Sequence, residues 1–327
     1  MVSSKDVAKM AGVSVSTVSR VFSNSDLVNR ETAQRVLDVA AKLHYVPNIS
    51  ARSLKLQRSD LLGVVLSDIS NPFYIQVLKD VFDYSQGSYR FLVVFSEEDK
   101  EKEAEAIETL ISSNVASLIF TPVAGSNPGI TEALTNNGIP ALQLYRNTYD
   151  NFDSLIIDDA YGAYLATREL IENGHRDIVL LDYDVEIPTH REEGYKRAFQ
   201  EAGLTCREDH FIRINIREDV NAAIRKHLSE KSFTAVIPVS SILAHAAINY
   251  LHACSLRIGE DVSVIIYDDI PLAQLSGISV VSHPFDKLTT TISEMIQGQL
   301  DQPGRPAQHK ELKPFLIRRS SVKRLIK

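Results

Sequence analysis

The chain has 327 residues, more than one hydrophobic core usually serves, so two or three domains are expected. Its 44% hydrophobic and 24% charged residues are typical of a globular protein, and no apolar run reaches the roughly 18 residues that a membrane helix needs. The net charge of −7 is unevenly spread, because residues 1–58 hold nine Lys/Arg against four Asp/Glu, a net of +5, which leaves −12 for the rest. This excludes a chain that attracts phosphate over its whole surface and favours one basic, nucleic-acid-binding lobe.

The basic segment begins with a helix, a glycine turn and a second helix. Ser3 is a suitable N-cap for a first helix through Ala11, with Val7, Met10 and Ala11 facing inward, and Gly12 ends that helix. Ser14 caps a second helix that runs to Phe22 and turns Val18, Val21 and Phe22 inward. A third helix over 30–43 has an inward side formed by Ala33, Val36, Leu37, Ala40 and Leu43.

The layout is typical of a helix-turn-helix, whose second helix enters the DNA major groove. Outward-facing side chains gather at the N-terminal end of that helix, the part that reaches base edges. They are Val15, Ser16, Thr17 and Arg20. The alternative is a small helical bundle whose polar faces only meet water.

A short segment follows the third helix. Pro47-Asn48 breaks the helix, and residues 49–56 are long enough for about two helical turns, which are not stable alone in water. Leu54 lies between Arg52 and Lys55, a pattern that suits minor-groove insertion, with the cations on phosphates and the apolar side chain as a wedge. The segment is therefore expected to order against DNA.

From Leu61 onward, apolar strands alternate with amphipathic helices, which predicts βαβ units and parallel sheets. A first cycle has strands at 61–66, 91–95, 116–120 and 141–144, with helices at 73–86 and 100–113. In the second helix, Ala104, Ile107, Leu110 and Ile111 are expected to face inward. A second cycle starts near Tyr161 and includes strands at 177–181, 235–238 and 262–267. Two cycles imply two lobes, and a ligand is expected in the cleft between them, beyond the carboxyl ends of the strands.

The strings Asp-Val-Ala-x-x-Ala-Gly-Val-Ser-x-x-Thr-Val-Ser-Arg-Val at 6–21 and Tyr-x-Pro-Asn-x-x-Ala-Arg-x-Leu at 45–54 resemble the signature of the LacI/GalR family of bacterial transcription repressors. Similar strings at 69–74, 162–167, 173–176 and 259–264 extend the resemblance over nearly the whole chain. It implies a dimer on palindromic operator DNA and a core like that of periplasmic sugar-binding proteins. In that arrangement Val15 and Ser16 would read bases, Thr17, Arg20 and Asn48 would hold the backbone, and Ala51 and Leu54 would enter the minor groove.

Five residues are candidate effector contacts. Phe73 can stack on a ligand ring or simply pack in the core, and Asp158 and Asp268 follow strands, where a carboxylate accepts from hydroxyls or caps a helix. The resemblance implies that Arg191 reaches into the cleft, the alternative being a surface arginine. Arg146, at the end of a strand, is a further candidate that can equally be structural.

Ser240-Ser241 stand where the family usually carries Asn-Asp, which removes two long polar groups from the expected site. A sugar needs several fixed polar partners, so control by a protein corepressor or a non-sugar metabolite remains an alternative to a sugar or sugar phosphate. An enzyme is disfavoured, because no nucleotide-binding, hydrolase or zinc-protease motif is present. A secreted binding protein is disfavoured by the basic lobe and by an N-terminus without an apolar signal region.

The sequence thus predicts a cytoplasmic, homodimeric DNA-binding repressor of carbohydrate genes, without cofactor, metal or membrane contact. Residues 320–327 hold too few apolar positions for a tetramer-forming coiled coil. The expected domains are a helix-turn-helix over 1–45, a hinge helix over 46–58 and an α/β effector-binding and dimerisation domain over 60–327. Its N-subdomain would span about 60–158 and 288–318, and its C-subdomain about 159–287.

Overall fold

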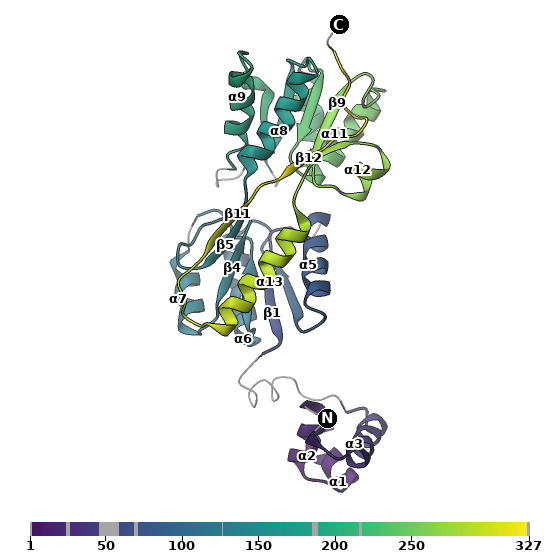
Figure 1. The fold of residues 1–327 in the computed structure, drawn as a ribbon, viewed down its shortest axis with the longest axis vertical. Helices are drawn as coiled ribbons and strands as arrows, with labels where there is room; N and C mark the ends of the chain where they lie inside the picture. The colour runs from purple at the N-terminus through teal and green to yellow at the C-terminus, as the bar shows by residue number, and fades with distance from the viewer. Residues whose placement is uncertain are drawn as a thin grey trace. The chain divides into compact units, whose positions relative to one another are not determined.

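A computed structural model describes residues 2–23, 27–45, 59–68, 71–125, 127–184, 189–215 and 218–325. The chain divides into two compact units, 1–60 and 61–327, each of which has its own core (Figure 1). The expected hinge segment, with Asn48, Ala51, Arg52 and Leu54, lies outside the described residues. In the part of the chain that is described, no helix is both long and apolar enough to span a membrane.

The described residues of the small unit form three helices, α1 (Ser4–Ala11), α2 (Val15–Ser23) and α3 (Arg30–Lys42). Val7, Val18 and Val36, one from each helix, are at most 1% exposed and form the centre of its core. Gly12 ends α1 in the left-handed region, at φ 66°, which glycine adopts without a steric penalty. The expected helix, turn and helix are therefore present at the expected residues.

Two side chains expected in this core face solvent instead. Met10 is 57% exposed and Leu37 is 40% exposed, whereas Ala8 and Val39 are buried. In α1 the small Ala8 is buried in place of Met10, and in α3 Val39 is buried in place of Leu37. Small side chains let short helices approach closely, so packing rather than residue size selects the buried face.

The large unit contains two six-stranded sheets. The first has the order β11-β5-β4-β3-β1-β2 with every pairing parallel, and the second has the order β12-β10-β9-β8-β6-β7 with only β12 antiparallel. The strands of the first sheet are β1 (Leu61–Leu66), β2 (Arg90–Phe95), β3 (Ser117–Phe120), β4 (Ala141–Leu144), β5 (Asp153–Ile157) and β11 (His309–Leu312). Those of the second are β6 (Ile178–Tyr183), β7 (Phe211–Ile214), β8 (Ala235–Pro238), β9 (Ser263–Tyr267), β10 (Ser279–Ser282) and β12 (Phe315–Ile317).

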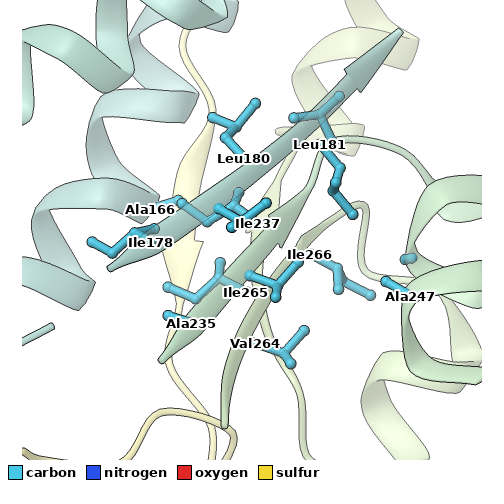
Figure 2. Close-up of a cluster of buried hydrophobic side chains, with 14 of the residues drawn as sticks. Ala166, Ile178, Leu180, Leu181, Ala235, Ile237, Ala247, Val264, Ile265 and Ile266 are labelled. Carbon is cyan, nitrogen blue, oxygen red and sulfur yellow. The ribbon is translucent and has the colours of Figure 1, made fainter. Parts of the chain in front are cut away.

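Helices cover both sheets, as parallel βαβ connections require. They are α5 (Pro72–Tyr84), α6 (Lys100–Ser112), α7 (Pro128–Asn136), α8 (Asp159–Glu172), α9 (Arg191–Glu201), α10 (Val220–Ser229), α11 (Ser241–Ala253), α12 (Pro271–Leu275) and α13 (Phe285–Asp301). In the second lobe, strand side chains such as Leu180, Ile237 and Ile266 are fully buried, with Ala166 of α8 on one side of the sheet and Ala247 of α11 on the other (Figure 2). Because both faces of these strands are buried, their sequences are unbroken runs of apolar residues. In α6, by contrast, Glu103 and Ala106 are buried where Ala104 was expected.

The chain passes between the two lobes three times, at 158, at 283–284 and at 313–314 (Figure 1). The first lobe is formed by 61–157 and 285–312, and the second by 159–282 and 315–325. The expected passages near 288 and 318 therefore come about four residues earlier. The first shift arises because α13 begins at Phe285 and packs on α5, and the second because β12 already pairs with β10.

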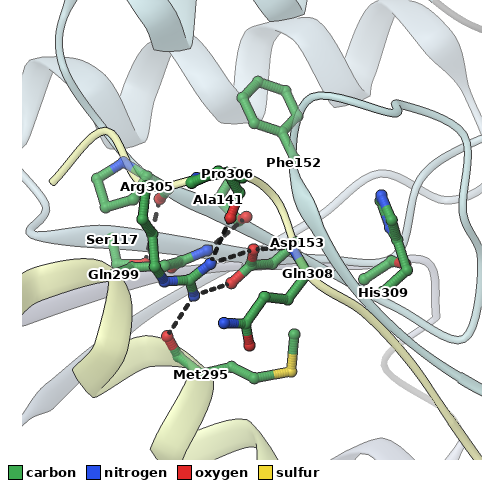
Figure 3. A network of polar contacts seen from close by, with 12 residues as sticks. Ser117, Ala141, Phe152, Asp153, Met295, Gln299, Arg305, Pro306, Gln308 and His309 are labelled. Atoms are coloured by element: carbon green, nitrogen blue, oxygen red, sulfur yellow. Dashed lines mark hydrogen bonds and ion pairs between the residues drawn. The ribbon is translucent and has the colours of Figure 1, made fainter. Parts of the chain in front are cut away.

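The return of the chain into the first lobe is fixed by a buried ion pair (Figure 3). The Asp153 carboxylate is 2% exposed and accepts from the Arg305 guanidinium at 2.9 Å and from the backbone N–H of Gln308 at 2.8 Å. Gln299 of α13 donates to the carbonyl of Ala141 at 2.8 Å. These bonds attach α13 and β11 to the sheet, so residues from near both ends of the large unit complete one lobe.

Candidate functional site

The outward face of α2 is polar, as expected for a helix that contacts DNA. Ser14, Val15, Ser16 and Arg20 are exposed and Thr17 is half-buried. The Ser14 hydroxyl accepts from the backbone N–H of Thr17 at 3.1 Å and lies 2.7 Å from the Ser16 hydroxyl, so it caps the helix and orders its first turn. An ordered first turn is what a recognition helix needs to present side chains to base edges.

A cleft of about 500 Å³ lies between the two lobes of the large unit. Its walls contain the residues that follow the carboxyl ends of the strands in both sheets, where ligands of open α/β sheets bind. They include Thr121 after β3, Tyr145 after β4, Asp158 after β5, Tyr183 of β6, Ser240 after β8, Asp268 after β9 and His283 after β10. All five candidate effector contacts, Phe73, Arg146, Asp158, Arg191 and Asp268, border this cleft.

Arg191, the first residue of α9, is the most strongly held of these side chains. Its guanidinium donates to Asp182 and to Asp159, both at 2.9 Å, and only 16% of the side chain is exposed. Burial lowers the pKa of Arg191, but Asp159 and Asp182 more than offset that effect and the pKa is raised overall. The residue is therefore a fixed cation on the second lobe and not a surface arginine.

Arg146, which follows β4, borders the cleft from the first lobe. Its two terminal nitrogens each donate to an oxygen of Glu98 at 2.8 Å, and one of them also donates to the carbonyl of Pro122 at 2.7 Å. The pair is nearly buried, with 16% of Arg146 and 11% of Glu98 exposed. Bidentate geometry of this kind is the most specific arginine–carboxylate contact.

The two aspartates differ in role. Asp158 caps α8, because its carboxylate accepts from the backbone N–H of Tyr161 at 2.8 Å, although it also borders the cleft. Asp268 caps no helix; it is 5% exposed, has a left-handed φ of 70°, and its Oδ1 lies 2.9 Å from Nδ1 of His283. Strained backbone at a non-glycine residue is concentrated at functional sites, and Asp268, Tyr145 and His190 all border this cleft in that conformation.

Aromatic rings form much of the remaining wall. Phe73 is 6% exposed and packs against Tyr145 at 5.3 Å and His283 at 4.7 Å between ring centres, so it is a core residue that also borders the cleft. Tyr183 accepts a hydrogen bond from Ser240 at 2.9 Å, and the Ser240 hydroxyl also accepts from the N–H of Leu243, where it caps α11. The serine that departs from the expected pattern is thus used within the protein.

Several buried polar atoms of the cleft wall have no partner within the described protein. They are the hydroxyls of Thr121, Tyr145 and Tyr267 and the Nε of Arg191. Burial raises the pKa of Tyr145 and of Tyr267 well above the usual range, so both keep their protons and can donate. Unsatisfied buried polar groups are costly, which indicates that these atoms meet a bound molecule or water in the cleft.

Reasoning from the sequence identified the two arginines but missed the carboxylates that bind them, Glu98, Asp159 and Asp182, and the tyrosines at 145, 183 and 267. Their positions at strand ends provided the signal, since each tyrosine ends or follows a parallel strand. Among the described residues, no cluster of three or more His, Cys, Asp or Glu side chains has the arrangement of a metal site.

Comparison with known proteins matches both units. Residues 4–48 match the family of bacterial regulatory proteins of lacI type, and residues 167–322 match the periplasmic binding protein-like domain. Curated relatives include the HTH-type transcriptional regulator RegA of Clostridium saccharobutylicum, 31% identical over 97% of this chain and 98% of RegA. The regulator GalR of Escherichia coli is 30% identical over 98% of this chain and 96% of GalR.

Solved structures agree with the fold. The transcriptional regulator CelR in complex with cellobiose superposes with a TM-score of 0.71 at 25% identity and covers 98% of this chain and 100% of its own. The lac repressor dimer bound to operator and an anti-inducer superposes with a TM-score of 0.76 at 23% identity, over 98% of this chain and 99% of its own. The two sheets of the large unit therefore form a two-lobed fold that is already known from solved structures.

Proposed function

Because the chain belongs to the LacI family of bacterial regulatory proteins and is a DNA-binding transcriptional repressor, we propose that it binds a palindromic operator as a homodimer and is controlled by a small molecule in its cleft. Its curated relatives are regulators, which confirms the expectation that it is not an enzyme.

The DNA-binding half of the proposal rests on the ordered, exposed first turn of α2 within a basic segment. Val15 and Ser16 read base edges, while Ser14, Thr17 and Arg20 position the helix on the phosphate backbone. From the sequence alone, Asn48, Ala51, Arg52 and Leu54 complete the interface. Operator selection from random DNA with the full chain, followed by gel-shift titration, tests the proposed DNA binding. A selected site without two-fold symmetry contradicts it, and so does an operator affinity that does not fall as the salt concentration rises.

The ligand-binding half rests on one observation, the unpartnered hydroxyls of Thr121, Tyr145 and Tyr267 in a 500 Å³ cleft between two lobes. Three hydroxyls that both donate and accept suit a hydroxyl-rich molecule, and the tyrosine and phenylalanine rings offer apolar faces to a sugar ring. CelR, solved with cellobiose, has the same fold at 25% identity. A carbohydrate is thus the ligand class that the cleft fits best.

Control follows from the three passages between the lobes. A ligand that contacts both lobes stabilises one arrangement of the lobes. It changes the affinity for operator only to the extent that it binds this arrangement more tightly than the other. We propose that the sugar-bound arrangement alters operator affinity through the segment at 46–58. Gel shifts with the selected operator, with and without a panel of sugars, test this; a sugar that binds the protein without changing operator affinity contradicts it.

The same experiments address the alternative of a protein corepressor. A tyrosine pair variant, Tyr145→Phe with Tyr267→Phe, keeps the rings and removes both free hydroxyls, so it should bind operator normally and lose the response to metabolite extract. If that variant still responds fully, the controlling partner binds outside the cleft.

A further inference from the structure

The cleft contains two arginines, and arginine is the usual protein partner of phosphate. Both guanidiniums are, however, already bound to carboxylates of the protein. Glu98 accepts from both terminal nitrogens of Arg146, and Asp159 and Asp182 each accept from one terminal nitrogen of Arg191. The Nε of Arg191 is buried and has no partner within the described residues. In both arginines the two terminal nitrogens, which form the end-on fork, are therefore engaged by carboxylates of the protein.

The rest of the lining adds negative charge. Among the described residues of the cleft, carboxylates outnumber arginines, with Asp158, Asp159, Glu193, Asp268 and Glu311 against Arg146 and Arg191. Glu98 and Asp182, which bind the two arginines from behind, increase the imbalance. A phosphorylated ligand, which carries nearly two negative charges at neutral pH, would meet a wall that repels it.

Helix N-termini are the other common phosphate sites, and three of those at the cleft are capped by side chains of the protein. Asn71 caps α5, Asp158 caps α8 and Ser240 caps α11, each by accepting from a backbone N–H of the first turn. The first turn of α9 carries Glu192 and Glu193, which offset its positive end. Among the described residues, the arginines of the wall are thus bound to carboxylates, and its helix N-termini are capped or flanked by acidic side chains.

Given the proposed function, on which this step rests, we propose that the cleft selects an uncharged, hydroxyl-bearing ligand and that Glu98 is the residue that excludes phosphorylated ones. Glu98 and Arg146 both belong to the first lobe, on the segments that follow β2 and β4. Glu98 has φ 55° and Tyr145, next to Arg146, has φ 67°, so both segments adopt left-handed backbone where the pair forms. A phosphate that took both terminal nitrogens of Arg146 would have to displace a bidentate carboxylate that is almost buried.

Glu98→Gln tests the proposal directly. The amide keeps the size of the side chain and one acceptor but removes the charge, and its NH₂ group cannot accept from Arg146, so the guanidinium becomes available. Glu97→Gln is the matched control, because it makes the same change one residue away on a side chain that pairs with Lys102 and not with Arg146. The double variant Glu98→Gln/Arg146→Gln should lose whatever Glu98→Gln gains.

The probes are inorganic phosphate and the pairs glucose with glucose 6-phosphate and ribose with ribose 5-phosphate, measured on the full chain by calorimetry and thermal shift. We expect wild type and Glu97→Gln to bind no phosphorylated probe more tightly than its neutral partner, and Glu98→Gln to bind phosphate at least about tenfold more tightly than wild type. A wild-type preference for a phosphorylated probe overturns the proposal whether or not the variants fold. A folded Glu98→Gln protein without the gain overturns the role of Glu98.

These outcomes do not depend on operator binding. If the full chain selects no operator, the proposed function fails while the discrimination between neutral and phosphorylated probes is still measured. If it binds operator but prefers a sugar phosphate, the proposed function stands and the inference about the cleft fails.

Discussion

The contact between α8 and α9 offers a quantitative test of how the cleft is positioned. Gly194 of α9 lies so close to α8 that a β-carbon added to it would stand 1.8 Å from the carbonyl oxygen of Ala160. Since β-carbons essentially never approach closer than 3.0 Å, Gly194→Ala must move the two helices apart by at least 1.2 Å, the difference of these distances. The atom it meets is backbone, which cannot swing aside.

The energetic estimate has two opposed contributions. Alanine in a helix interior is favoured over glycine by roughly 1 kcal/mol, whereas overpacking costs about 1–3 kcal/mol and more when backbone must shift. We expect a net loss of about 2 kcal/mol of unfolding free energy. We also expect weaker ligand binding, because Arg191 and Asp159 begin these two helices and are joined at 2.9 Å across them.

Urea denaturation of Gly194→Ala and wild type measures the first effect, and calorimetry with a sugar that binds wild type measures the second. Gly298→Ala in α13 is the control, since the nearest atom to its added β-carbon is 3.7 Å away and the change should be neutral or slightly stabilising. If the two variants are equally stable, the packing argument for Gly194 is wrong.

Three further predictions concern other parts of the chain. Asp153→Ala should destabilise the protein by about 3–5 kcal/mol in urea, because it leaves the Arg305 guanidinium without its buried partner; a loss below 1 kcal/mol would show that water replaces the carboxylate. Burial raises the pKa of Glu103 from 4.5 to about 7, so its contribution to stability is complete below pH 4.5 and is lost as the pH rises through 7. Compared with Glu103→Gln, wild type should lose about 3 kcal/mol over that interval, and parallel stability curves for the two proteins would contradict this. Ser16→Ala should relax base choice at one or two symmetric operator positions without changing the salt slope, and an unchanged selected sequence would remove Ser16 from base reading.

The elements and the fold class could be predicted because they depend on local and periodic signals. The strands at 61–66, 141–144 and 235–238 begin and end where the apolar runs in the sequence begin and end. Gly12 ends α1 because a left-handed backbone conformation is required there. The buried faces of short helices were harder to predict, as Met10 shows, because the packing partner decides which edge of an apolar stripe is covered.

The candidate site could be predicted only in part, for a related reason. Position after a strand identified Arg146 and Asp268 as cleft residues, since the carboxyl ends of parallel strands meet at one edge. The partners of the arginines come from distant segments: Glu98 is 48 residues from Arg146, and Asp159 is 32 residues from Arg191. No local pattern encodes such pairs, so whether an arginine is available to a ligand becomes visible only in three dimensions.

The three passages between the lobes also determine when the chain can fold during synthesis. Everything that the DNA-contacting unit needs for its core lies within the first 45 residues, so it can fold while the ribosome is still translating the sheets. The first lobe instead requires α13 and β11 and is complete only once residue 312 has emerged, and the second requires β12 and is complete only after residue 317. A nascent chain therefore carries a finished DNA-contacting unit well before it carries a finished cleft.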